Sequence, residues 1–104
     1  MSTAFAQEVL ETLRKNGSDI TKPHTFEFYL YVPKEILATK VANKIRQSGF
    51  TAEVSRSGKR WECVASKTLV PATADLGDEA RFFEQIAAAV GGEFDGWETA
   101  LIES

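Results

Sequence analysis

The stretch "HTFEFYLYVPKEILATKVANKIRQSGFTAEVS", residues 24–55, decides the fold because two kinds of periodicity follow each other in it. Apolar and polar residues alternate over 24–32, which is typical of a half-buried strand. After Pro33, apolar residues recur at the spacing of one helical face, and Gly49 is a typical helix stop. A short alternating segment follows at once. The stretch therefore predicts a strand–helix–strand unit.

The sequence after this unit completes the pattern. Residues 60–66 alternate like the second strand of a hairpin, which we expect to turn at Ser57-Gly58 because glycine tolerates the positive φ of such turns. Residues 73–90 have the apolar spacing of a helix, ended by one glycine of the pair at 91–92. Residues 93–102 are expected to form the last strand.

The whole order is a helix followed by β-α-β-β-α-β. It predicts an α+β, ferredoxin-like sandwich in which a four-stranded antiparallel sheet carries two helices on one face, with an extra N-terminal helix. The first and third strands should lie in the middle of the sheet. We expect one domain over residues 1–104, with the N-terminal helix at 1–17 and the ferredoxin-like core at 24–102.

The second face of such a sheet is bare in this architecture, yet apolar and aromatic residues point to it. Tyr29 and Tyr31 lie on that side of the first strand, and Val64 of the third strand is expected beside them. Three explanations stay open: the N-terminal helix crosses this face, the tyrosines are ordinary half-exposed residues, or another protein covers them.

Composition and charge place the chain among soluble proteins of the cytoplasm. Its single cysteine excludes an internal disulfide and suits a reducing compartment. The N-terminus lacks the pattern of a secretory signal, and no apolar run approaches the ~20 residues that span a bilayer. The net charge of −3 is uneven, since residues 75–104 hold eight acids and one base. Such a distribution can steer a charged partner or can be scattered solvated charge.

The sequence offers little for catalysis. His24 is expected to be an edge or cap residue, and Cys63 a small core residue. Neither a cluster of metal ligands nor a phosphate-binding glycine loop is present. Asp95 and Glu98 are the best acid/base candidates, but residues three apart on a straight strand face opposite sides unless a bulge at Gly96 brings them together. We therefore predict no enzymatic activity and no cofactor.

Direct RNA binding is not expected either. Sheets that bind RNA display aromatic residues on both central strands among basic residues. Here the third strand would place Arg60, Glu62 and Val64 beside the tyrosines, while Glu27 and Glu53 add negative charge. A phosphate backbone would be repelled as much as held.

The segment "EFDGWET", residues 93–99, resembles the Tyr-Asp-Gly-Trp ending of the bacterial RraB-like family (regulator of ribonuclease activity B), with Phe94 in the tyrosine's place. The segments "FEFYLYVP", "GFTAEV", "WECVAS" and "LVP" follow one another in the family's order. The similarity spans roughly His24 to Thr99. Members of this family inhibit ribonuclease E, so the resemblance implies a ferredoxin-like fold, no catalytic residue, no cofactor, and binding of the nuclease that alters RNA turnover.

We expect a divergent member that is less acidic than the family's established inhibitors and lacks their acidic tail after the motif. We expect a non-enzymatic regulator of ribonuclease E in the bacterial cytoplasm, as a monomer or a weak homodimer that binds neither nucleic acid nor membrane. The alternative is a stand-alone interaction or dimerisation module with another partner. The candidate partner-binding residues are Tyr29, Tyr31, Asp95, Trp97 and Glu98.

The glycine-rich segment has a structural interpretation as well. Asp95-Gly96 is expected to form a bulge or turn, with the Asp95 carboxylate bonded to nearby backbone amides and Trp97 packed inward. On this interpretation the segment is mainly a signature of the fold.

Overall fold

The computed structural model describes residues 2–103, with side chains described from Ala4 onward. Within that range the chain forms three helices and four strands. They are α1 (Ser2–Lys15), β1 (His24–Val32), α2 (Glu35–Gln47), β2 (Thr51–Ser57), β3 (Arg60–Leu69), α3 (Leu76–Ala88) and β4 (Glu93–Thr99).

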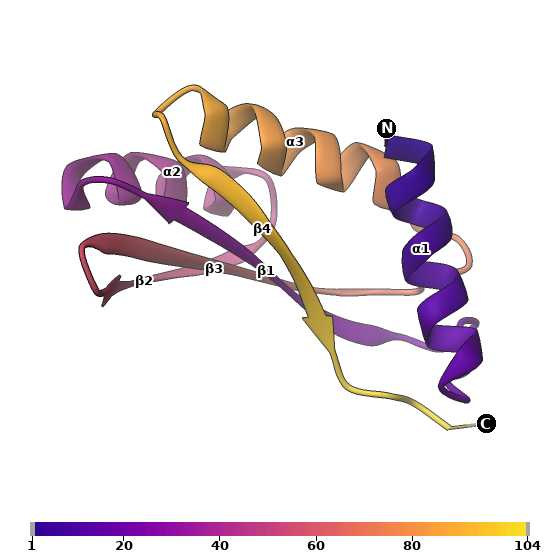
Figure 1. Cartoon of the computed structure of the whole chain (residues 1–104). Helices are drawn as coiled ribbons and strands as arrows, with labels where there is room; N and C mark the ends of the chain where they lie inside the picture. Colours follow the sequence, from indigo (N-terminus) through magenta and orange to yellow (C-terminus); the bar gives the residue numbers. More distant parts are fainter. Residues whose placement is uncertain (1, 104) are drawn as a thin grey trace.

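The four strands form one sheet in the order β2-β3-β1-β4, and all neighbours are antiparallel. Helices α2 and α3 lie side by side on the same face of this sheet (Figure 1). The two central strands are β1 and β3. The predicted ferredoxin-like arrangement is therefore confirmed.

The core lies between the sheet and these two helices. The alternation of β1 sends Phe26, Phe28, Leu30 and Val32 under the helices, where all four are fully buried. The Phe28 ring stacks on Phe83 of α3 with ring centroids 4.7 Å apart. Burial of each such side chain contributes about 2–3 kcal/mol to folding. Strand β1 is therefore held firmly, and its remaining side chains have fixed positions on the opposite face of the sheet.

Helix α1 packs against α3 on the helical side of the sheet, at the end where β1 begins (Figure 1). Its apolar residues Val9 and Leu13 are buried, and the Phe5 ring lies 5.9 Å from that of Phe94 on β4. No described part of the chain covers the opposite face of the sheet. The interpretation in which α1 crosses that face is therefore wrong.

Buried His24 ties the chain beyond β4 to the loop that follows α1. Its Nδ1 lies 2.8 Å from the carbonyl oxygen of Lys22, an acceptor, so Nδ1 carries the proton and donates. Its Nε2 is hydrogen-bonded to the Ser18 hydroxyl, 2.7 Å away, and the hydroxyl oxygen accepts from the Ile102 amide at 2.8 Å. The histidine is thus a structural anchor at the start of β1.

The position of the hairpin turn and the end of the last strand differ from the sequence prediction. The hairpin turns at Gly58-Lys59, since Ser57 pairs with Arg60. Gly58 takes the first turn position with a φ of 62°, which glycine adopts readily. Strand β4 ends at Thr99 because the chain after it leaves the sheet to bond the Ser18 region.

The glycine pair after α3 has two separate roles. Gly91 adopts a φ of 70° and ends the helix, and the Gly92 amide donates back to the Ala87 carbonyl at 2.9 Å, as in a Schellman motif. Gly92 also lies against β1: a Cβ on it would be 2.4 Å from the Tyr31 carbonyl oxygen. The second glycine therefore lets the chain enter β4 directly beside β1.

Candidate functional site

The open face of the sheet is the surface opposite the helices, and we use that name for it throughout. Register pairing places Tyr29 opposite Val64 and Tyr31 opposite Glu62 on this face. Both tyrosines are half-buried although no helix lies over them. The carboxylates of the open face are Glu27, Glu53, Glu62, Glu93, Asp95 and Glu98. Arg60 is the one cationic residue that the described strands place there.

Tyr29 bridges two carboxylates on neighbouring strands. Its hydroxyl lies 2.8 Å from the Glu98 carboxylate, to which it donates, and 3.3 Å from that of Glu27. Glu27 and Glu98 are direct cross-strand partners, and like charges in that position repel. The hydrogen bond to Glu98, partial burial and the charges of both glutamates raise the pKa of Tyr29 far above its ordinary value. The phenol is therefore a neutral donor between two negative groups.

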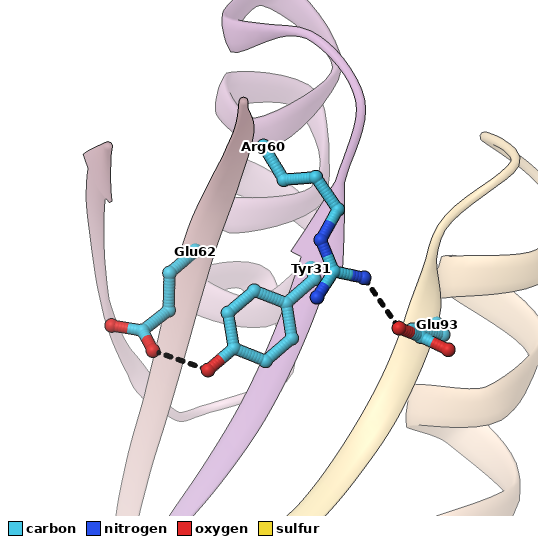
Figure 2. Close-up of polar contacts among 4 residues, drawn as sticks. All are labelled: Tyr31, Arg60, Glu62 and Glu93. Atoms are coloured by element: carbon cyan, nitrogen blue, oxygen red, sulfur yellow. Dashed lines mark hydrogen bonds and ion pairs between the residues drawn. The ribbon is translucent and has the colours of Figure 1, made fainter. Parts of the chain in front are cut away.

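Tyr31 carries an arginine on its ring (Figure 2). The Arg60 guanidinium carbon is 4.6 Å from the ring centroid, and the same guanidinium forms an ion pair with Glu93. The Tyr31 hydroxyl donates to the Glu62 carboxylate at 2.8 Å. This hydrogen bond raises the pKa of Tyr31, with added contributions from burial and nearby carboxylates, while Arg60 opposes the shift.

A β-bulge in β4 determines which side chains reach this face. The register shifts between the partners of Phe28 and Leu30, so Asp95 and Gly96 both lie opposite Tyr29. Gly96 has a φ of 114°, a value that favours glycine. The extra residue places Asp95 and Glu98 on the same side of the sheet. In the described chain the Asp95 carboxylate makes no hydrogen bond to the nearby amides, so the expected Asx-type turn is not formed.

Four of the five predicted binding residues thus share one face, and the fifth does not. Trp97 pairs with Phe28 on the helical side of the sheet, where its ring lies 5.9 Å from that of Phe26. It packs inward, as the structural interpretation of the segment predicted. Trp97 cannot contact a partner at the same surface as Tyr29.

Two hollows indent the molecule along β1 and β4. One, of about 410 Å³, is lined by Glu27 and Glu98 with Thr25, Ser66, Thr99 and Ala100. The other, of about 270 Å³, is lined by Tyr31, Arg60 and Glu93 with Val32, Pro33, Gly91 and Gly92. Each hollow therefore adjoins one of the two tyrosine arrangements.

Of the groups that sequence reasoning weighed for catalysis, His24 and Cys63 are buried, whereas Asp95 and Glu98 lie on the open face. Cys63 is fully buried, and this burial raises the pKa of its thiol to about 11, so it is a poor nucleophile at neutral pH. Among residues 2–103, no group of three or more His, Cys, Asp or Glu side chains is arranged to hold a metal ion. The described helices include none long and apolar enough to cross a membrane.

The family model for regulator of ribonuclease activity B matches residues 3–99, from α1 to the end of β4. The chain belongs to the RraB family. No curated protein matches it. The match covers every helix and strand described above, so the open face is part of the RraB-family domain itself.

Sequence reasoning missed part of this candidate site. Glu93 was counted only among the eight acids of residues 75–104, and Arg60 and Glu62 were placed on the third strand only when RNA binding was weighed. The sequence signal for Glu93 was its position directly after the glycine pair, where β4 enters the sheet beside Tyr31. The β1–β4 register was needed to recognise it.

Proposed function

We propose that this RraB-family chain is a non-enzymatic regulator that binds ribonuclease E and inhibits it in the bacterial cytoplasm. The observation that carries the proposal is the open face, where six carboxylates surround two half-buried tyrosines and only one arginine offsets them. Such a surface attracts a basic protein segment and repels RNA. It fits the regulation of a nuclease by protein contact.

The tyrosines suit a protein interface because tyrosine contributes large contact area at low entropic cost and is enriched in binding hot spots. We propose Tyr29, Tyr31, Asp95 and Glu98 as partner-binding residues. Trp97 would act indirectly, by packing against Phe26 on the helical side of the sheet and holding β4 in register. Its replacement should weaken binding only as far as it loosens the strand.

The same charges argue against self-association through this face. A two-fold dimer brings the same patch of two copies together, so the carboxylates of the open face would oppose those of the second copy. The face therefore favours a basic partner over a second copy. Dimerisation through an exposed strand edge would leave the face available.

The test is to measure binding and inhibition together. Purified ribonuclease E is captured on the immobilised chain, and its cleavage of a labelled RNA is followed with and without the chain, at about 0.05 M and about 0.3 M salt. We expect capture and inhibition at low salt and their loss at high salt, where the Debye length falls to about 6 Å. Full cleavage activity with excess chain at low salt, and no capture, would refute the proposed function.

A further inference from the structure

The open face contains one arginine-binding arrangement that the chain fills itself. Arg60 stacks on the ring of Tyr31, its guanidinium pairs with Glu93, and the tyrosine hydroxyl is held by Glu62 (Figure 2). Three features define it: an aromatic ring on the open face, a carboxylate beside the ring, and a second carboxylate that fixes the hydroxyl. Arginine suits such a site because its planar guanidinium stacks on rings and bonds carboxylates at once.

Tyr29 is a second aromatic ring on the open face whose hydroxyl is fixed by a carboxylate, but without an arginine. Its hydroxyl is fixed by Glu98, the Glu27 carboxylate lies 3.3 Å from the hydroxyl oxygen, and Asp95 lies opposite through the bulge. No guanidinium or ammonium group of the described chain stacks on this ring. The neighbouring hollow of about 410 Å³ has room for several waters of about 30 Å³ each, which an entering side chain can displace.

In the described chain, the carboxylates around Tyr29 lack the ion partner that Arg60 provides beside Tyr31. Glu93 has Arg60 as its ion partner, whereas Glu27 and Glu98 face each other across the two strands with only the neutral phenol between them. A cation placed there would relieve the repulsion between directly opposed carboxylates. The uncompensated negative charge and the aromatic ring of Tyr29 therefore both favour an arginine side chain.

We infer that Tyr29, with Glu27, Glu98 and Asp95, receives an arginine side chain from a basic segment of the partner, stacked as Arg60 stacks on Tyr31. Residues two apart on a strand lie about 7 Å from each other on one face, so a segment running along β1 meets the filled arrangement and the empty one in succession. The inference rests on the proposed function for the identity of the partner. It adds which side chain the face selects and where.

The experiment uses short fluorescein-labelled peptides in place of the nuclease. A peptide of alternating glycine and arginine is compared with its glycine–lysine counterpart of equal length and charge, by fluorescence anisotropy at low salt. We expect the arginine peptide to bind about threefold more tightly, as one exposed cation–π contact allows. Tyr29→Leu should abolish this preference while leaving a residual affinity for both peptides.

A charge-matched pair of variants locates the site. Glu27→Gln/Glu98→Gln should weaken the arginine peptide about tenfold, whereas Glu8→Gln/Glu11→Gln, on the exposed side of α1, removes the same charge and should change binding less than about twofold. The Gln amide oxygen still accepts from Tyr29 and the repulsion is gone, so the first variant should melt no lower than the wild type. That melting temperature separates loss of the site from loss of the fold.

Equal affinity for arginine and lysine peptides, or equal weakening by the two charge variants, would overturn the inference. Its failure is distinct from that of the proposed function. If ribonuclease E is inhibited but the peptides show neither pattern, the nuclease binds elsewhere on the chain. If the peptides show both patterns but the nuclease is not inhibited, the site is as inferred and the proposed target is wrong.

Discussion

Replacement of Gly92 by alanine tests whether the entry of β4 is built as described. The added Cβ would lie 2.4 Å from the Tyr31 carbonyl oxygen and 2.8 Å from Val32 Cγ1. Both contacts are far inside van der Waals distance. Strand β1 cannot yield easily, since it is bonded to β3 on one side and β4 on the other. The start of β4 must therefore move away from β1.

Overpacking of this kind costs about 1–3 kcal/mol, and contact with a fixed backbone places Gly92→Ala at the upper end, about 3 kcal/mol. A change of that size lowers the melting temperature by about 12 °C or more in a domain this small. The control is Gly17→Ala, where no atom lies within 4 Å of the new Cβ and only the φ of +81° is unfavourable, at about 1 kcal/mol.

Urea unfolding followed by tryptophan fluorescence gives both free energies. Gly92→Ala should be the less stable by about 2 kcal/mol and should also weaken partner binding, because Glu93 follows directly and pairs with Arg60. Equal unfolding free energies for the two variants would refute the close approach of Gly92 to β1.

Three further predictions concern buried and hydrogen-bonded groups. Ser18→Ala leaves the Ile102 amide and a histidine nitrogen without a partner, which should cost about 2 kcal/mol and speed amide exchange at Ile102. The Cys63 thiol should resist modification in the native protein. Because its pKa rises from 9.0 to about 11 on folding, the unfolded thiol ionises first, so stability should fall by about 2–3 kcal/mol between pH 9 and pH 11 in an alkaline unfolding series. Glu98→Gln keeps an acceptor for the Tyr29 hydroxyl but removes the negative charge that strengthens this hydrogen bond and raises the Tyr29 pKa, so tyrosinate absorbance should appear at lower pH than in the wild type.

The sequence was sufficient for those parts of the fold that depend on local periodicity. The alternation of 24–32 identified both faces of β1, so the burial of Phe28 and the position of Tyr29 and Tyr31 on the opposite face followed directly. The structural interpretation of residues 93–99 also placed Trp97 inward, although Trp97 was named as a binding candidate as well. These features need only the side-chain period of a strand and the handedness of its connections.

Features set by distant residues were beyond such reasoning. The amphipathic stripe of α1 showed that it packs, but only the apolar surface of α3 and Phe94 determines on which side of the sheet. The network of His24 involves Ser18 and Ile102, which are far apart in sequence. The arginine-filled arrangement at Tyr31 requires the β1–β4 register, and the bulge that sets Asp95 beside Tyr29 shifts this register within the strand.

The central claim is that the open face binds the nuclease, and one comparison of affinities tests it most directly. The dissociation constant of ribonuclease E is measured for the wild type, for Glu27→Gln/Glu98→Gln and for Glu8→Gln/Glu11→Gln at the same salt concentration. We expect about tenfold weaker binding, or about 1.4 kcal/mol, for the open-face variant and wild-type affinity for the α1 variant. Equal affinity of all three proteins, or weakening only by the α1 variant, would contradict it.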